Sequence, residues 1–479
     1  MATRRAAAKR GGGGGGNGNG GGSSSNNDAQ GRAGAAGHRG GAAAESVFER
    51  SNREAWQPPT RALFAALLLP TAVMMARVGS MHHWIAVQLG VCTAVSVAAF
   101  LITLRMIPLV APKLAPKLHG VDLGKRGLGG PNDGKALPES LGIVSGTVFM
   151  MSIGVLQFTF GASNDQLLEY NAALLSICFA VLLGLVDDVI DIKWKHKLVI
   201  GVVMALPLLL SYKGGTTVLM PRALAPYLAN DSSLAAALNI IPTVSVHPSG
   251  DILDLGFLYY VYMASLVVFC TNAVNIYAGI NGLEVGQSIV AAASITVVNL
   301  QDIEWRGGKA EDILTGDGRN HLFSLMVLLP FIATAAALMR FNFYPAQVFI
   351  GDVFPYYAGM TIAVAAILGH FSKSLLLLII PQVINFVYSV PQLFHLIPIP
   401  RHRLPRLDQA TGLMHASKVA PGDDRNNKTL ICAALGLFGP MHERTLCILL
   451  LAFQALCSVV GIAVRGSLST AVFARPDAY

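Results

Sequence analysis

Long, uninterrupted blocks of apolar residues are the feature that most constrains how this chain folds. Eleven such blocks follow one another at roughly 62–79, 85–110, 141–160, 168–186, 198–212, 255–274, 283–299, 322–339, 353–370, 374–398 and 446–464. Inside lipid every backbone polar group needs an internal partner, so segments of this length must be helices. A β-barrel would show polar–apolar alternation, which these blocks lack. The pattern predicts an all-α polytopic membrane protein, a bundle of about 10–11 transmembrane helices.

The composition agrees with that class. Hydrophobic residues make up 53% of the chain and charged residues only 13%, whereas soluble domains carry roughly 25% charged residues. These values exclude a soluble globular enzyme, a disordered scaffold and a nucleic-acid binder. The net charge of +8 comes from loops and a tail beside apolar blocks, so the partner that it indicates is membrane lipid and not nucleic acid.

The domain organisation follows from changes in composition. Residues 1–55 are rich in Gly and Ala with scattered Arg, and we expect a disordered basic tail there because nothing in it can form a core. We predict an extra N-terminal hydrophobic segment at 56–84, a transmembrane domain at 85–470 and a short tail at 471–479. Whether block 62–79 spans the membrane stays open, since it contains Pro70 and is short before Arg77.

The distribution of Lys and Arg predicts the orientation. From block 85–110 onward, the loops alternate between two faces of the membrane. One face carries 17 Lys and Arg residues and the other carries 6, so the first face is expected in the cytosol. Segment 1–61 holds nine more basic residues, which join the cytosolic face only if block 62–79 spans. The charge rule therefore favours eleven spans over ten.

The cytosolic face also collects polar residues that a simple membrane anchor would not need. Asp187, Asp188 and Asp191 end one apolar block. On a continuing helix, the first and the third would share a face. Carboxylates are costly at a membrane boundary unless they are paired, hydrated or bound to a cation. Helix-end solvation is the simpler alternative, but the adjacent pair favours a role in metal or phosphate chemistry.

Amide side chains and glycines lie at the end of the block 255–274. Asn272 and Asn275 are three residues apart and share a helix face, and Gly279 and Gly282 follow. These glycines predict a break in the helix, which is tolerated at membrane depth where it lines a hydrated cavity. Amide oxygens can bind Mg²⁺, although packing between helices is the alternative. A Gly351-Asp352 pair lies on the same face of the membrane as these amides.

A cationic cluster follows the block 374–398. Arg401, His402, Arg403 and Arg406 occur within six residues. Such a segment usually attracts anionic lipid headgroups, whereas guanidinium groups also match the oxygens of a diphosphate. Lys197 is the further cation that could reach a phosphate. Acids, amides and cations on one face suit a magnesium-bound polyphosphate and a second substrate that arrives from lipid.

These residues resemble the polyprenyl-phosphate N-acetylhexosamine-1-phosphate transferases (glycosyltransferase family 4), and especially the members that use UDP-GlcNAc and dolichyl phosphate. The matching stretches occur in the family's order and cover about 85–470: 138–146, 185–194, 269–284, 344–352, 369–372 and 400–405. The resemblance implies transfer of GlcNAc-1-phosphate from UDP-GlcNAc to dolichyl phosphate, with release of UMP. The product, GlcNAc-diphosphodolichol, begins the lipid-linked oligosaccharide for protein N-glycosylation. The resemblance also implies a multi-pass protein of the endoplasmic reticulum membrane, with its active site facing the cytosol and Mg²⁺ as cofactor. The resemblance does not decide whether the protein forms a homodimer.

The resemblance also implies roles for the polar residues. Asn275 and Asp352 correspond to the metal ligands, and Asp187 and Asp188 correspond to the acidic pair that orients the metal and the lipid phosphate. Which of the two acids takes a proton, if either does, stays open. Lys197 corresponds to a cation that holds phosphate oxygens.

The cationic cluster and the nucleotide contacts complete the expected site. Arg401 and Arg403 correspond to groups that hold phosphate or sugar, and His402 and Arg403 lie where the family reads the N-acetyl group. Phe349 resembles the residue that stacks on uracil. The remaining substrate-binding residues implied by the resemblance are Leu123, Glu139, Asp191 and Asn281.

Four positions depart from the family's pattern. Val121 stands where we expect a glutamine near the uridine, Asp191 replaces a common Asn, and Phe343 and Val353 replace a common Trp and Thr. None of these changes removes a core catalytic group, although they could shift the affinity for nucleotide.

Three other functions fit parts of the pattern. The acids at 187–191 match a magnesium-diphosphate motif of intramembrane prenyltransferases, but the partner segment carries Asn272 and Asn275 where that class needs a second acidic motif. An intramembrane aspartyl protease needs one lone Asp on each of two helices, which the adjacent pair contradicts. A nucleotide-sugar transporter would distribute its polar groups through the bilayer.

Two smaller features complete the predictions. The sequons at Asn230 and Asn427 lie on opposite faces, so we expect a glycan at Asn230 only. The six cysteines show no paired spacing, and we interpret them as small hydrophobic residues.

Overall fold

A computed structural model describes residues 58–81, 83–122, 136–159, 164–229, 232–305, 317–400, 403–408, 410–420 and 422–472. The predicted tail at 1–55 lies outside the described residues. The helices are α2 (Pro58–Met81), α3 (His83–Leu114), α4 (Gly142–Thr159), α5 (Asn164–Ile190), α6 (Trp194–Ser211), α7 (Ala225–Leu228), α8 (Ser233–Leu238), α9 (Phe257–Ile276), α10 (Leu283–Trp305), α12 (Asp317–Asn342), α13 (Val353–Leu368), α14 (Ser372–Leu378), α15 (Ile380–Leu393), α16 (Leu430–Phe438) and α17 (Glu443–Val472). The strands are β1 (His119–Gly120), β2 (Leu137–Pro138), β3 (Thr217–Leu219), β4 (Ser245–Val246), β5 (Ile252–Asp254), β6 (Arg406–Leu407) and β7 (Met414–His415).

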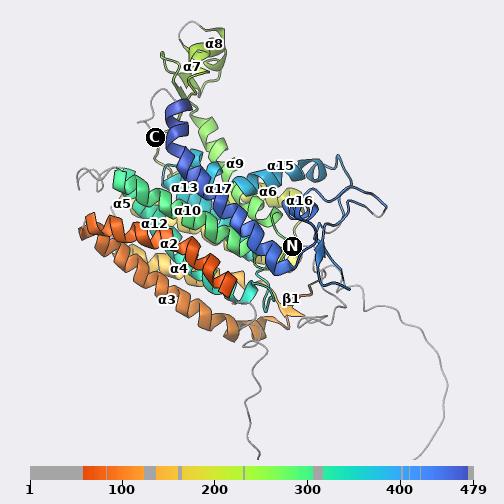
Figure 1. Cartoon of the computed structure of the whole chain (residues 1–479). Coiled ribbons are helices and arrows are strands. Elements are labelled where there is room, and N and C mark those ends of the chain that lie inside the picture. The colour runs from red at the N-terminus through yellow and green to blue at the C-terminus, as the bar shows by residue number, and fades with distance from the viewer. Residues whose placement is uncertain are drawn as a thin grey trace, which may run out of the picture.

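Every apolar block of the sequence forms helix, which confirms the predicted class of fold (Figure 1). In the described part of the chain, six helices are long and apolar enough to cross a membrane: α3, α5, α9, α10, α12 and α17. The block 374–398 differs from the prediction of one straight span, because it forms α14 and α15, which meet at Ile379 with a bend of 79°. Counting this pair as one span makes seven.

The block at 62–79 forms α2, which lies beside α3 and also packs against α10 (Figure 1). It is not among the six span candidates found in the described residues. Val78 of α2 is fully buried in a small apolar cluster with Leu300 and Leu325. Arg77 also pairs with Glu304, with 2.5 Å between Nη2 and Oε1. The extra segment is therefore a docked helix, and its spanning of a membrane stays a prediction.

Helix α13 forms the centre of the bundle. All of its residues from Val353 to Leu368 are buried, and it packs against α4, α5, α9, α10 and α12. An apolar helix that is buried on every side has no lipid-facing surface. The aromatic rings of Phe354 and Tyr357 pack edge to face, with centroids 5.2 Å apart. Residues at the start of α13 are therefore held by the core and not by a surface loop.

Short strands lie in the connections between helices, which the all-helical prediction did not anticipate. A three-stranded antiparallel sheet, β3-β5-β4, lies with α7 and α8 in a small unit at one end of the bundle (Figure 1). The backbone N–H of Arg222 in this unit donates to the carbonyl of Val472 at the end of α17. The β1-β2 pair lies toward the opposite end of the bundle (Figure 1). Strands of two or three residues are too short to leave a periodic pattern in the sequence.

All six cysteines are free, as their spacing predicted. Cys92, Cys270, Cys432 and Cys447 are buried, whereas Cys178 is exposed and Cys457 is half-buried on the bundle.

Candidate active site

Three carboxylates and one lysine lie close together, buried, where α5 ends, α6 begins and α13 begins. Asp187, Asp188, Asp352 and Lys197 are 2%, 8%, 1% and 8% exposed. The Nζ atom of Lys197 lies 2.5 Å from Oδ2 of Asp187 and 3.7 Å from Oδ2 of Asp352. The fold therefore brings together four predicted site residues, three from the end of α5 and the start of α6 and one from the distant start of α13, and we refer to these four as the acidic cluster.

Close packing of α5 against α13 produces this arrangement. A Cβ atom built on Gly184, one turn before Asp188, would lie only 2.8 Å from the backbone nitrogen of Val353. Only glycine permits the two backbones to approach this closely. The backbone N–H of Asp352 then donates to Oδ1 of Asp188 at 2.7 Å. Asp352 is the N-cap residue of α13, so the carboxylate of Asp188 lies at the positive end of that helix dipole.

Asp191 does not join the acidic cluster. The expectation that it shares a helix face with Asp187 is wrong, because α5 ends at Ile190 and Asp191 is exposed with φ = +53°. Its backbone N–H still bonds to the carbonyl of Asp187 at 2.9 Å. The left-handed conformation of Asp191 turns the chain away from the helix axis. Its role in substrate binding stays a prediction.

The charge balance of the acidic cluster favours a bound cation. The ammonium group of Lys197 faces the carboxylates of Asp187 and Asp352, and Asp188 adds a third carboxylate beside Asp352, so negative charge is in excess when all four groups are ionised, and like charges this close repel. The Oδ1 atom of Asp352 is buried and has no hydrogen-bond partner among the described residues. Asn275, on the last turn of α9, is half-buried, and α9 packs against α13.

These groups fit a magnesium ion that arrives with its substrate. Within the part of the chain that the structure describes, no three His, Cys, Asp or Glu side chains are arranged to hold a metal ion by themselves. Mg²⁺, however, commonly binds through one or two carboxylates plus substrate phosphates and water. The unpaired oxygen of Asp352 and the amide of Asn275 therefore suit a shared metal better than a closed protein cage.

The predicted uracil-stacking residue lies beside the β1-β2 pair. Phe349 is 1% exposed, and its backbone N–H donates to the carbonyl of Pro138 at 2.8 Å. A Cβ atom built on Gly120 would lie 3.0 Å from Cδ2 of Phe349 and 3.2 Å from Oε2 of Glu139. Glu139 is 4% exposed. The structure thus brings Phe349 and Glu139 together, as the resemblance implied.

Asn281 reaches the same region from the break between α9 and α10. Its Nδ2 donates to Oδ2 of Asp122 at 3.2 Å, and its backbone N–H donates to Oε1 of Glu443 at 2.8 Å. Asp122 follows β1 and precedes Leu123, which lies outside the described residues. Phe349, Glu139 and Asn281 therefore lie around one segment, from Gly120 to Asp122, and we call these three residues the nucleotide pocket after the role that the resemblance implies for them.

The cationic loop is described only from Arg403 onward, since Arg401 and His402 lie outside the described residues. A Cβ atom built on Gly279 would lie 3.0 Å from Cδ2 of Leu404, so this loop covers the break between α9 and α10. Nη1 of Arg403 is buried without a hydrogen-bond partner in the described structure, and burial lowers the pKa of its guanidinium. Arginine stays protonated in proteins, so a buried, unpaired guanidinium favours an anionic ligand.

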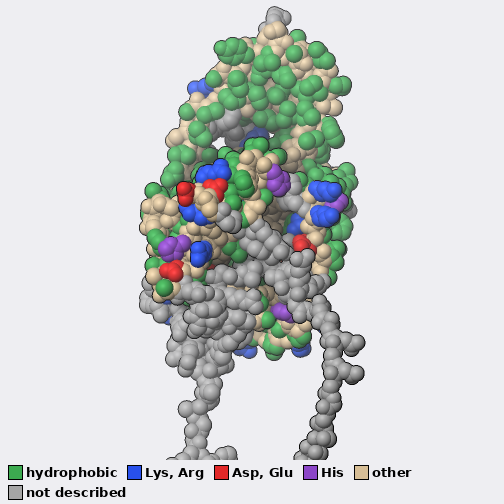
Figure 2. All heavy atoms as spheres, turned by 90° about the vertical axis from the view of Figure 1, so that its right-hand side faces the viewer, with side chains coloured by type: hydrophobic (Ala, Val, Ile, Leu, Met, Phe, Trp, Pro, Cys, Tyr) green, Lys and Arg blue, Asp and Glu red, His purple; other side chains and the backbone are tan. Residues whose placement is uncertain are grey.

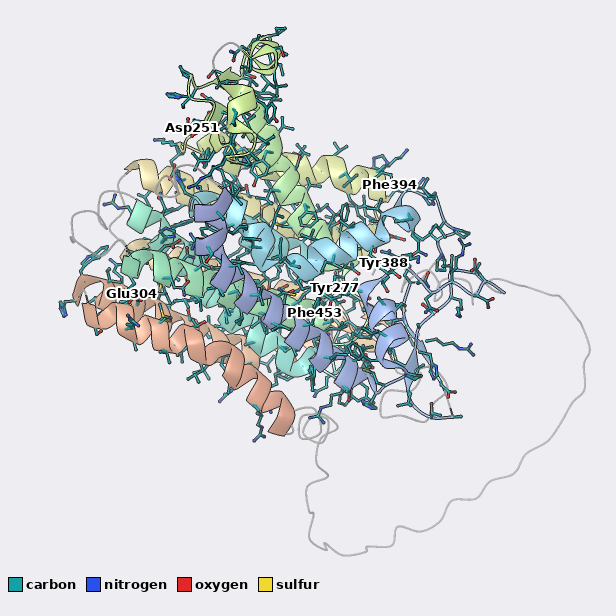
Figure 3. The ribbon with its side chains drawn as sticks, turned by 45° about the horizontal axis from the view of Figure 1, so that its top comes forward. Asp251, Tyr277, Glu304, Tyr388, Phe394 and Phe453 are labelled. Atoms are coloured by element: carbon teal, nitrogen blue, oxygen red, sulfur yellow. The ribbon has the colours of Figure 1, made fainter. Side chains whose placement is uncertain are left out.

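Two buried polar residues that the sequence analysis missed hold the helix break. Gln287 of α10 is fully buried, and its Nε2 donates to the carbonyl of Tyr277 at 2.7 Å and to that of Val274 at 3.3 Å. Tyr277, the first residue of the break, lies in the interior of the bundle (Figure 3). Glu443 is the second missed residue, as the acceptor for Asn281. A polar residue inside an apolar block is a functional signal that could have identified Gln287.

The distribution of side chains on the surface agrees with a single polar site on an otherwise apolar protein. On the side where α15 and α16 lie, charged and histidine side chains gather across the middle of the face below a mainly hydrophobic surface (Figure 2). The acidic cluster, the nucleotide pocket and Arg403 supply carboxylates, an aromatic ring and a cationic group. This combination can bind a nucleoside diphosphate and a phosphate that is carried on a lipid.

Comparison with known proteins supports this interpretation. The family model described as glycosyl transferase family 4 matches residues 170–370. A protein of Dictyostelium discoideum named UDP-N-acetylglucosamine–dolichyl-phosphate N-acetylglucosaminephosphotransferase is 43% identical over 394 residues, which cover 80% of this chain and 90% of that protein. Proteins of the same name from Leishmania amazonensis and Saccharomyces cerevisiae are 35% and 34% identical and also cover 80% of this chain, with 94% and 92% of their own lengths matched.

These identities extend over most of the chain, and the stretch matched by the family model contains the four residues of the acidic cluster. The chain therefore belongs to glycosyl transferase family 4, and within it to the UDP-N-acetylglucosamine–dolichyl-phosphate N-acetylglucosaminephosphotransferases.

Proposed function

We propose that this chain transfers GlcNAc-1-phosphate from UDP-GlcNAc to dolichyl phosphate, giving GlcNAc-diphosphodolichol and UMP. The observation that carries the proposal is the buried acidic cluster, in which Lys197 pairs with Asp187 and Asp352 beside the nucleotide pocket. The names of the relatives support the same substrates.

In the proposed reaction, an oxygen of dolichyl phosphate attacks the β-phosphorus of UDP-GlcNAc. A new P–O bond forms, the bond from the β-phosphorus to the bridging oxygen breaks, and UMP leaves with that oxygen and its electron pair. The phosphate monoester is already largely ionised near neutral pH, so the step needs no general base. Positioning and neutralisation of charge are then the main tasks of the protein.

Each described group has a task in this scheme. Asp352 and Asn275 would hold Mg²⁺, which when bound neutralises charge on the diphosphate and on the departing UMP. Asp187 orients Lys197 through their 2.5 Å ion pair, and the ammonium group can turn to a phosphate oxygen when substrate enters. Arg403 offers its unpaired Nη1 to the sugar phosphate or the N-acetyl group.

The nucleotide pocket sets the position of the leaving group. In this proposal Phe349 stacks on uracil, and aromatic stacking on a base contributes about 1–3 kcal/mol. Asn281 and Glu139 supply polar atoms at the edge of the same region. Arg401, His402 and Leu123 keep their proposed roles at phosphate, N-acetyl group and uridine.

We also propose that the site faces the cytosol from the endoplasmic reticulum membrane. The bias of 17 against 6 basic residues between the two sets of loops supports this orientation. Cysteines introduced at Arg406, beside the site, and at Tyr227, in the unit at the other end of the bundle, can be labelled in sealed microsomes. Labelling of the first but not the second by an impermeant reagent is expected, and the reverse pattern would refute the orientation.

One assay tests the activity directly. Purified protein is incubated with UDP-GlcNAc, dolichyl phosphate and Mg²⁺, and each component is omitted in turn. We expect UMP and a glycosylated diphosphate lipid only in the complete mixture. A parallel incubation supplies a prenyl diphosphate with Mg²⁺, and release of inorganic pyrophosphate there, with no UMP from the complete mixture, would instead support the prenyltransferase alternative. Turnover that persists in EDTA would remove the proposed cofactor.

A further inference from the structure

Asn342, the last residue of α12, joins the two sides of the nucleotide pocket without being one of its expected contacts. It is 3% exposed. Its Oδ1 accepts a hydrogen bond from the backbone N–H of Gly282 at 3.2 Å, and its Nδ2 donates to the carbonyl of Val348 at 3.0 Å. Gly282 follows Asn281 and Val348 precedes Phe349, so one amide bonds to the backbone next to both nucleotide residues.

The surrounding backbone leaves little freedom at this junction. Gly282 has φ = +86°, and a Cβ atom built there would lie 2.8 Å from Cδ2 of Phe343 and 3.3 Å from its Cα. The backbone N–H of Val348 also folds back to the carbonyl of Phe341 at 3.3 Å. The break between α9 and α10 therefore contacts the turn after α12 directly, and Asn342 lies at the point of contact.

We propose that Asn342 is a positioning residue that holds Asn281 and Phe349 at the spacing that a uridine nucleotide requires. The inference rests on the proposed function, which assigns these two residues to the nucleotide. An asparagine amide suits the task because it offers one donor and one acceptor at the same time. Aspartate would keep the acceptor toward Gly282 and lose the donor toward Val348, and leucine of similar size would lose both.

The neighbouring contacts predict a limited defect and not a collapse. The backbone N–H of Asn281 keeps its bond to Glu443, and the backbone N–H of Phe349 keeps its bond to Pro138. In the Asn342→Leu variant each side of the pocket is still anchored, but the two sides are no longer tied to each other. Misplacement of binding groups by a fraction of an ångström weakens binding and catalysis.

A matched control comes from the same pair of helices. Asn299 of α10 is fully buried and also makes two side-chain hydrogen bonds to α12: its Nδ2 donates to Oγ of Ser324 at 2.7 Å, and its Oδ1 lies 2.8 Å from Nδ1 of His321. It lies 17 residues along the chain from Gly282, which is about 25 Å of helix. Asn299→Leu therefore removes a buried amide of equal connectivity far from the pocket.

The test measures equilibrium binding of UMP and of UDP-GlcNAc by calorimetry, without metal or dolichyl phosphate, for wild type, Asn342→Leu, Asn342→Asp and Asn299→Leu. We expect Asn342→Leu to raise both dissociation constants about tenfold, the equivalent of one hydrogen bond, and Asn299→Leu to leave them within about twofold. In turnover assays, the KM for UDP-GlcNAc should rise while the KM for dolichyl phosphate stays unchanged. Where the leucine variant does not fold, Asn342→Asp provides the comparison.

The outcomes separate this inference from the proposed function. If wild type binds UMP and the Asn342 variants bind it equally well, or if Asn299→Leu weakens binding as much, Asn342 has no positioning role. If the wild-type protein binds neither UMP nor UDP-GlcNAc even after dolichyl phosphate and Mg²⁺ are added, the proposed function itself fails.

Discussion

The ion pair of Lys197 is the feature whose removal has the clearest expected cost. The lysine is 8% exposed and faces two carboxylates. Lys197→Met leaves the three acids of the cluster without their cation. Breaking a buried ion pair by removing one partner costs about 3–5 kcal/mol of unfolding free energy. We expect the metal-free protein to lose an amount in this range.

Asp187→Asn should cost less, and the distances show why. After this change, the Nζ atom of Lys197 still lies 3.7 Å from Asp352, compared with 2.5 Å from Asp187 before it. Coulomb energy falls inversely with distance, so Asp352 supplies about two-fifths of the attraction between Lys197 and the two carboxylates, and this part is retained. The change also removes one of three mutually repelling carboxylates. We therefore expect a loss of at most about 2–3 kcal/mol, three-fifths of the lysine's cost.

The assay is an unfolding titration with SDS in mixed micelles containing EDTA, followed by far-ultraviolet circular dichroism. The control is Arg465→Met, which removes a guanidinium paired with Asp302 at 2.7 and 2.9 Å. This pair is more exposed to solvent, because the side chains of Arg465 and Asp302 are 24% and 18% exposed. A more solvated pair is expected to contribute about 1 kcal/mol or less. Equal losses for Lys197→Met and Asp187→Asn, or a neutral Lys197→Met, would refute the reasoning.

Three further substitutions and one measurement of glycosylation test other parts of the structure. Asp352→Ala should abolish UMP release while the protein still inserts and folds, and a wild-type rate would remove its metal role. Arg403→Ala should lower the preference for UDP-GlcNAc over UDP-glucose by about tenfold, and an unchanged ratio of kcat/KM values would contradict its contact with the N-acetyl group. Gln287→Leu leaves two buried carbonyls of the helix break without their donor. The SDS titration should therefore show a loss of about 1–3 kcal/mol in the free energy of unfolding. No loss would mean that the helix break does not depend on Gln287 for its stability. Asn427 is fully buried and bonded to Gln392, so mass spectrometry of microsomal protein should find a glycan at Asn230 and none at Asn427, and a modified Asn427 would overturn the orientation.

The sequence by itself determined the class of fold and most of the candidate site. Apolar blocks of membrane length must form helices because lipid offers no partner for the backbone, and every block did so. Helix parity then predicted that the acids, amides and cations lie on one face of the membrane. The motif residues Asp187, Asp188, Lys197 and Asp352 do meet in the structure.

Only the tertiary structure decided where the chain bends and which groups face each other. The bend at Ile379 lies inside an apolar run, where Pro381 is compatible with the start of a new helix but does not determine the angle of 79° between α14 and α15. Asp191 leaves the helix that its spacing suggested, because α5 ends one residue earlier. Such choices depend on packing between helices that are distant in sequence.

The same reason explains why the positioning residues escaped the sequence analysis. Asn342 is an ordinary polar residue in sequence, and Gln287 differs only in lying inside an apolar block. The importance of both lies in the backbone groups that they satisfy. Those groups belong to a helix break and a turn that exist only after the bundle has assembled. A buried backbone N–H or carbonyl needs a partner, and which side chain supplies it is settled by three-dimensional proximity alone.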